Sequence, residues 1–91
     1  MDILSQINHR ERQLLVTSYL YYKLDENIIT DDKFDEYAFD LVSMMERYPK
    51  EFKKSDFYKG FCGFDGSSGF DLPYMDDRIK RVALWFHNNK E

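Results

Sequence analysis

The sequence predicts a mainly all-α fold: an antiparallel helical hairpin over about residues 5–48, an ordered loop rich in glycine and phenylalanine over about 51–74, and a C-terminal helix over about 75–88. The first observation behind this prediction is that apolar residues recur at helical spacing in three separate segments. The second is composition, since 43% of the 91 residues are apolar and 18% are aromatic, which is too apolar for a disordered chain. This length favours one small domain over residues 1–91.

The first predicted helix covers roughly residues 5–24. Ser5 is placed to cap its N-terminus, and the polar run Asp25-Glu26-Asn27 is placed to end it. The apolar residues that recur at helical spacing along it are Leu4, Ile7, Leu14, Leu15, Tyr21 and Tyr22.

The second predicted helix begins where Thr30 can cap free N–H groups and Asp31 and Asp32 oppose the positive end of the helix dipole. It should end before Pro49. Because only about five residues separate the two helices, they are expected to fold back as an antiparallel hairpin with their aromatic faces in contact. The apolar stripe of this helix contains Phe34, Tyr37, Ala38, Leu41, Met44, Met45 and Tyr48.

The remaining segment is predicted to be less regular. Residues 55–58 are suited to a single turn that folds Phe52, Phe57 and Tyr58 onto the hairpin, and the glycines that follow at every third position from Gly60 oppose a helix. Pro73 suits the first turn of the last helix, which should cover the hairpin. Its apolar stripe is predicted to contain Ile79, Val82, Ala83 and Phe86.

Charge and composition limit the classes of partner. The net charge of −4 argues against duplex DNA, and no apolar run is long enough for a bilayer or a signal peptide, so a cytoplasmic protein is expected. The single cysteine, Cys62, is interpreted as a packing residue. Residues 31–48 are mainly acidic and residues 78–90 mainly basic. This asymmetry indicates either two solvated faces that attract each other across the domain or an acidic surface for a cationic partner.

The hairpin connection is the first candidate ligand site. Asp31 and Asp35 are four residues apart and therefore share one helical face, close to the aromatic rings of Tyr21 and Phe34, with Tyr22 beside them. Such a set is suited to a flat cationic ring such as nicotinamide. The alternative is structural, with the carboxylates favoured by the helix dipole and the rings packed in the core.

Residues 18–50 resemble the N-terminal (Ia-type) domain of the NAD-dependent DNA ligases of bacteria. That domain has a helix bearing Y-L-Y-H, an I-x-D-x-x-Y-D connection and a second helix ending near Y-P. Tyr21, Asp31 and Asp35 match its ligand-contacting residues, whereas Tyr22 replaces the histidine and Phe34 the tyrosine. The resemblance implies a helical hairpin that binds NAD or nicotinamide mononucleotide, with no catalysis of its own and no required cofactor.

Two other features do not predict an enzyme. The run Gly63-Phe64-Asp65-Gly66 is similar to the ligase adenylation motif K-x-D-G, but glycine stands where the nucleophilic lysine is needed, so an Asx-turn is the simpler interpretation. His9 and His87 lack a nucleophile or a carboxylate cluster at recognisable spacing, and solvated helix surfaces are predicted for both. No metal site is predicted.

The last candidate is a surface of the C-terminal helix formed by Trp85, Arg78 and Arg81. Trp85 falls one position off the apolar stripe, and exposed aromatic and arginine side chains are typical of protein contacts. The alternative is that Trp85 packs on the glycine-rich loop. The sequence thus leads to a non-enzymatic nucleotide-binding module. The alternative function is a bacteriophage-type interaction or inhibitor (decoy) protein that acts on a host protein without binding a nucleotide.

Overall fold

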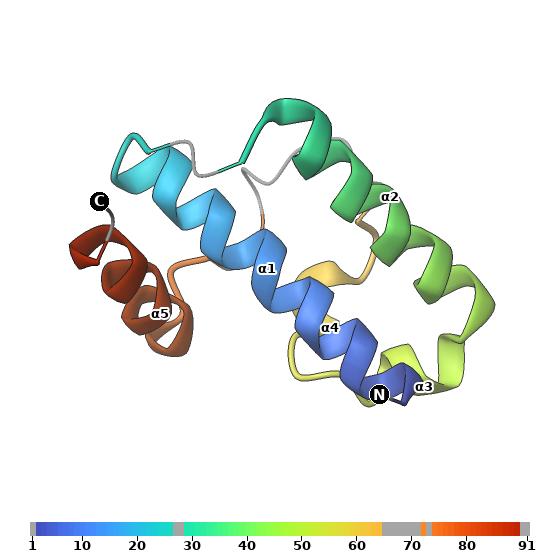
Figure 1. Cartoon of the computed structure of the whole chain (residues 1–91). Helices are drawn as coiled ribbons and strands as arrows, with labels where there is room; N and C mark the ends of the chain where they lie inside the picture. Colours follow the sequence, from blue (N-terminus) through green and yellow to red (C-terminus); the bar gives the residue numbers. More distant parts are fainter. Residues whose placement is uncertain (1, 27–28, 65–71, 73, 90–91) are drawn as a thin grey trace.

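A computed structural model of the protein describes residues 2–26, 29–64, 72 and 74–89, and this part of the chain is helical without strands. Figure 1 shows α1 as the central helix, with α2 on one side of it and α5 on the other. The predicted all-α class, the helical hairpin and the C-terminal helix are therefore confirmed. The helices are α1 (Ile3–Lys23), α2 (Asp31–Arg47), α3 (Pro49–Lys53), α4 (Tyr58–Phe61) and α5 (Asp77–Asn88).

The N-terminus of α1 is capped one turn earlier than predicted. The side chain of Asp2, and not Ser5, is the cap, because the Asp2 carboxylate accepts a hydrogen bond from the Ser5 N–H at 2.7 Å. An N-cap side chain reaches the free N–H three residues ahead, so Ser5 becomes a first-turn residue. The other end agrees with the predicted stop. Asp25 adopts a left-handed conformation (φ 55°), and the Leu20 carbonyl accepts from the N–H groups of Leu24 and Glu26.

The buried surface of α1 is wider than a single stripe. Tyr21 and Tyr22, predicted to lie on the stripe, are exposed, and Tyr19 is the buried ring instead. The reason is that neighbouring helices cover α1 on two sides, so buried residues occupy consecutive positions along its second half. The buried apolar residues of α1 are Ile7, Leu14, Leu15, Val16, Tyr19 and Leu20.

Helix α2 follows its prediction closely. The Thr30 hydroxyl accepts a hydrogen bond from the Lys33 N–H at 3.2 Å, and the helix ends at Arg47, before Pro49. Ala38 and Leu41 are fully buried. The other members of its stripe pack partly buried at the edge of the core; they are Phe34, Tyr37, Met44, Met45 and Tyr48.

The segment predicted as a loop contains two short helices, α3 and α4, so the prediction was wrong for residues 51–53 and 58–61. Pro49 is the first residue of α3, and Gly60 lies inside α4. Burial of Phe61 offsets the roughly 1 kcal/mol that glycine costs in a helix. The predicted turn is present, since the Tyr58 N–H donates to the Ser55 carbonyl. The glycine-rich residues 65–71 and Pro73 lie outside the described residues.

Helix α5 begins at Asp77, two residues later than predicted, with Asp76 as its cap. It buries Ile79 and Ala83 against α1, but the other two members of the predicted stripe, Val82 and Phe86, are 41% and 42% exposed. The contact is narrow because α5 packs on the single helix α1 and lies away from α2. Cys62, predicted to pack, is exposed.

One hydrophobic cluster joins the buried residues of all five helices. Leu14 and Leu41 connect the hairpin, and Phe52, Phe61 and Ile79 bring in α3, α4 and α5 respectively. The hairpin connection and the exposed face of α5 are thus held on one packed core.

Candidate functional site

The hairpin connection presents Tyr21, Asp31 and Asp35 to solvent, and Tyr22 beside them is 38% exposed. Tyr21, near the end of α1, is 49% exposed and meets the ring of Tyr22 edge-on with centroids 4.9 Å apart. Asp31 and Asp35 are exposed at the start of α2, and neither forms an ion pair with a described residue. These three are also the positions that match the ligase motif.

The other two predicted ligand residues pack against the protein. The ring of Tyr22 stacks on Tyr74, just before α5, at a centroid distance of 5.7 Å and an interplanar angle of 19°. Phe34 is partly buried against the core. Tyr22 and Phe34, the two positions at which the sequence departs from the ligase motif, therefore carry rings that pack against other parts of the protein.

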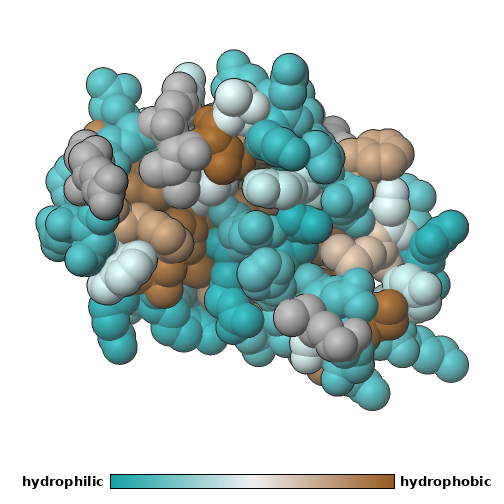
Figure 2. Space-filling view, viewed as in Figure 1, coloured by the Kyte–Doolittle hydropathy of each residue, from teal (hydrophilic) through white to brown (hydrophobic). Residues whose placement is uncertain are grey.

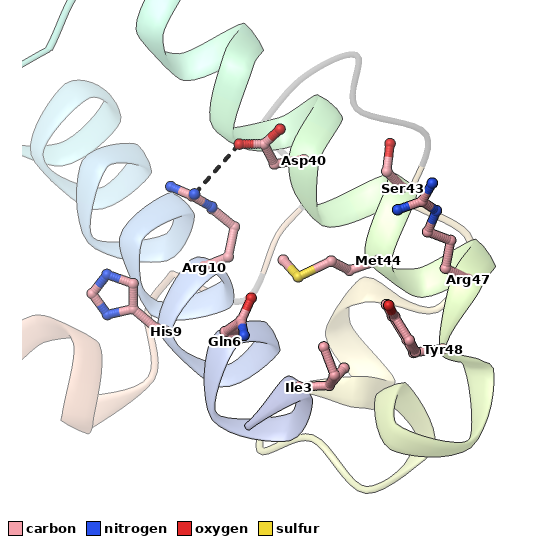
Figure 3. Close-up of a pocket in the computed structure, with 9 residues that line it drawn as sticks. All are labelled: Ile3, Gln6, His9, Arg10, Asp40, Ser43, Met44, Arg47 and Tyr48. Carbon is pink, nitrogen blue, oxygen red and sulfur yellow. Dashed lines mark hydrogen bonds and ion pairs between the residues drawn. The ribbon is translucent and has the colours of Figure 1, made fainter. Parts of the chain in front are cut away.

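A cavity of about 370 Å³ lies at the opposite end of the hairpin, and none of the five predicted residues lines it. Figure 3 shows Arg10 of α1 and Asp40 of α2 facing each other across it, whereas His9 lies on the side of α1 away from α2. The cavity is lined by Ile3, Gln6, His9, Arg10, Asp40, Ser43, Met44, Arg47 and Tyr48.

The Arg10 guanidinium is held in place by three neighbours. It donates to Gln13 at 2.6 Å and to Asp40 at 3.4 Å, and it stands over the Tyr37 ring with its central carbon 4.6 Å from the centroid. The charge of Arg10 is thus paired with Asp40. Ser43 of α2 carries the hydroxyl of the cavity, but His9 lies on the far side of α1, so no histidine is beside this hydroxyl to act as a base. This cavity has no catalytic constellation, and it is best described as a polar recess in the hairpin.

Sequence reasoning missed a buried carboxylate, Glu11, which is 0% exposed. It accepts hydrogen bonds from the Ser55 hydroxyl at 2.7 Å and from the Phe57 N–H at 3.2 Å. Burial raises the pKa of Glu11, while these two hydrogen bonds act in the opposite direction. The signal was available, since Glu11 is four residues after Ile7 and three before Leu14, in the middle of the apolar stripe.

Two further contacts hold the same segment to α1. The Asn8 side-chain oxygen accepts from the Asp56 N–H at 2.8 Å, and Arg12 pairs with Asp56 at 3.7 Å. Together with Glu11 they fix the connection between α3 and α4. The group is structural, because its hydrogen bonds and ion pair join α1 to the segment between α3 and α4.

The outer side of α5 carries the predicted partner surface. Trp85 is 60% exposed, which agrees with its place off the apolar stripe, and its ring packs edge-on against Phe86 with centroids 5.2 Å apart. Arg81 is exposed without an ion pair to any described residue. Arg78 is exposed but engaged: it donates twice to Asp76 and stands over the Phe57 ring. On the face in Figure 2, apolar side chains gather at the α5 side of the molecule.

The ion pair between Asp76 and Arg78 shifts the pKa of both groups. The hydrogen bonds from Arg78 lower the pKa of Asp76, and the same contact raises the pKa of Arg78. Both groups therefore stay charged through the physiological range, and the start of α5 keeps a closed ion pair beside the free cation of Arg81.

The two histidines differ from each other. His9 is exposed, as predicted, but His87 is half-buried and its Nδ1 lies 2.5 Å from a Glu26 carboxylate oxygen, so the prediction of a solvated His87 was wrong. The connection after α1 brings Glu26 to the end of α5, a contact between residues 61 positions apart that no local pattern reveals.

No family model, no curated protein and no solved structure was found to match this chain. Within residues 2–26, 29–64, 72 and 74–89, no group of three or more histidine, cysteine, aspartate or glutamate side chains is arranged to hold a metal ion. In the same residues, no helix combines the length and the apolar character that crossing a membrane requires.

Proposed function

We propose that this protein is a non-catalytic nucleotide-binding module that holds NAD or nicotinamide mononucleotide at the hairpin connection. The observation that carries this proposal is the exposure of Tyr21, Asp31 and Asp35 at the joined ends of α1 and α2. They are the three residues that match the ligase motif, and the two aspartates have no ion-pair partner among the described residues.

The chemistry of these side chains suits a ribosylated nicotinamide. The Tyr21 ring offers an aromatic face to the flat cationic ring, and carboxylates accept hydrogen bonds from ribose hydroxyls. Asp31 and Asp35 lie one turn apart on α2, so both can reach one ligand. Because no nucleophile and base converge among the described residues of this site, the proposed role is binding without reaction.

Thermal unfolding with increasing nicotinamide mononucleotide or NAD tests this proposal. A ligand that binds only the folded protein adds about 2.7 kcal/mol of stability at 100 times its dissociation constant. The shift should disappear in Asp35→Ala and in Asp31→Ala. Asp32→Ala is the matched control, because Asp32 is an exposed aspartate of the same turn that matches no ligand position. An unchanged melt at millimolar ligand would exclude the nucleotide function.

A second candidate function is favoured by the outer side of α5. Four of its large apolar side chains are 40% or more exposed, which is unusual for a helix that packs on a core. They are Val82, Leu84, Trp85 and Phe86. We propose on this observation that the chain acts as a protein-interaction or inhibitor module, of the kind encoded by bacteriophages, with Trp85, Arg78 and Arg81 in its contact surface.

Capture of a defined protein by the immobilised chain tests the second function. Trp85→Ala should abolish capture, whereas Tyr21→Ala, which removes an exposed ring at the other candidate site, should leave it unchanged. Equal capture by both variants would rule out α5 as the contact surface.

A further inference from the structure

We infer that the exposed face of α5 binds the exposed acidic face of α2 in a second copy of this chain. This inference rests on the second function proposed above and names the partner of the same surface. The basic-apolar face of α5 is defined as Arg78, Arg81, Val82, Trp85 and Phe86. The acidic face of α2 is defined as Asp32, Asp35, Glu36, Phe39 and Glu46.

The basic-apolar face is continuous along the helix. Residues 78, 81, 82 and 85 follow the i, i+3, i+4, i+7 spacing that places side chains on one side of a helix. Trp85 is the most exposed of its apolar members, and Arg81 supplies a cation without a described ion-pair partner. A surface of this composition, aromatic and aliphatic with arginine at its edge, fits an apolar partner that carries carboxylates.

The acidic face of α2 has the complementary composition. Asp32, Phe39 and Glu46 are seven residues apart and therefore share one side of the helix. Phe39 is 71% exposed and is the most exposed large apolar side chain among the described residues. Asp32, Asp35 and Glu46 form no ion pair with a described residue, so their charges are open to an outside cation.

These two faces cannot satisfy each other within one molecule. Helices α2 and α5 pack on opposite sides of α1, so their outer faces point away from each other, as Figure 1 shows. Among the described residues, the ion pairs that involve α2 are Arg10–Asp40 and Lys33–Glu36, and neither reaches α5. A second copy supplies both the missing carboxylates and a ring for Trp85.

The geometry determines the kind of assembly. Two different patches of the same chain meet, so a pair keeps a free acidic face on one copy and a free basic-apolar face on the other, and association is head-to-tail without closing at two copies. The charges steer the encounter and are screened by salt, whereas burial of Trp85 and Phe39 provides the short-range attraction. Association should therefore be strongest at low ionic strength.

Sedimentation velocity over a range of concentrations at low and at high salt tests this inference. The expected result is a mass that rises with concentration at low salt and falls towards the monomer at high salt. Trp85→Ala and Phe39→Ala should each weaken association about tenfold or more. Tyr21→Ala is the matched control, because it removes an exposed ring outside both faces. Circular dichroism would verify that each variant is folded.

Mixing the two variants gives the sharpest test. Trp85→Ala keeps an intact acidic face and Phe39→Ala keeps an intact basic-apolar face, so an equimolar mixture should form a one-to-one heterodimer that grows no further. A chain that stays monomeric at all concentrations, or a mixture that stays monomeric, would overturn the inference. Tight binding of a different protein to α5 by a monomeric chain would also overturn it, while leaving the second proposed function standing. Asp35 belongs to both the acidic face and the proposed nucleotide site, so the association test uses Phe39→Ala and Trp85→Ala, which lie outside the nucleotide site, and nucleotide binding is measured by its own melt.

Discussion

Helix α1 is covered on two sides, and the two sides differ in how much apolar surface they bury and in how many polar contacts they form. On the side of α2, α3 and α4, apolar burial is combined with long-range polar contacts: Leu41 is fully buried, Arg10 pairs with Asp40, and Glu11 binds Ser55. On the side of α5, burial is limited to Ile79 and Ala83 on that helix, with the Glu26–His87 contact at its end.

This difference distinguishes residues that stabilise the fold, on the side of α2, α3 and α4, from exposed residues of α5 that are available to contact another molecule. Among the described residues of α2, α3 and α4, Phe39 is the one large apolar side chain that is mostly exposed, and charged side chains surround it, whereas α5 leaves most of its large apolar side chains exposed. A helix that needed only to cover the core would have buried them. The α5 side is therefore where an outside partner gains most from apolar burial.

Truncating Leu41 should produce the largest loss of stability, because it removes buried apolar atoms from the side of α1 that α2 covers. Leu41→Ala is expected to lower the free energy of unfolding by about 3 kcal/mol, since the site is fully buried and leaves a cavity. Val82→Ala, on the exposed side, should cost less than about 1 kcal/mol. Urea denaturation measures both, and equal losses would contradict the distinction between the sides.

Removing the buried carboxylate should have the second-largest effect. Glu11→Ala leaves the Ser55 hydroxyl and the Phe57 N–H without their acceptor in the interior, and should lower the free energy of unfolding by about 2 kcal/mol. Asp56→Ala, which removes an exposed partner of Arg12, is the control and should cost less than about 1 kcal/mol. A Glu11→Ala variant as stable as the control would show that the hydrogen bonds of Glu11 to Ser55 and Phe57 do not stabilise the fold.

The same carboxylate should give stability a characteristic dependence on pH. Because burial raises the pKa of Glu11 above its ordinary value of 4.5, the folded protein keeps this proton at a pH where the unfolded chain has lost it. The contribution of Glu11 to stability is therefore full below pH 4.5 and is lost as pH rises through the folded pKa. Glu11→Gln should lack this decline in urea unfolding measured across the window. A parallel pH profile would exclude Glu11 as its origin.

Removing the N-cap of α2 should lower stability by less than removing Leu41 or Glu11. Thr30→Ala removes the hydroxyl that accepts from the Lys33 N–H, and should lower the free energy of unfolding by about 1 kcal/mol. Thr30→Ser keeps the acceptor and should restore most of the loss. Chemical denaturation of the two variants decides the matter, and equal stability of alanine and serine at this position would argue against a working cap.

Local patterns predicted the elements whose signals are contained in a few neighbouring residues. Thr30 with Asp31 and Asp32 located the start of α2, and Pro49 located its end. The apolar stripe of α5 left two positions open for Trp85, at the surface or packed on the glycine-rich loop, and the structure leaves it 60% exposed. Local patterns misplaced the start of α1, where two polar residues, Asp2 and Ser5, competed as caps and spacing alone did not rank them.

Features that depend on tertiary contacts were missed. The burial of Glu11 depends on Ser55, and the position of His87 depends on Glu26; these partners are 44 and 61 residues away. Tyr22 was assigned to a ligand site on local spacing, but its ring stacks on Tyr74, which no helical periodicity could reveal. Gly60 enters α4 because Phe61 is buried, which again is decided by packing and not by intrinsic helix preference.

Ser18 should give the smallest effect, and in the stabilising direction. Its hydroxyl lies buried in the middle of α1 without a hydrogen-bond partner among the described residues. A buried polar group without a partner is destabilising, and alanine also favours the helix, so Ser18→Ala should raise the free energy of unfolding by about 0.5 to 1 kcal/mol. Thr17→Ala is the matched control. The Thr17 hydroxyl donates to the Gln13 and Leu14 carbonyls, so its removal does not relieve an unsatisfied buried polar group. A loss of stability in Ser18→Ala would mean that the hydroxyl is satisfied, and urea denaturation of the two variants distinguishes these outcomes.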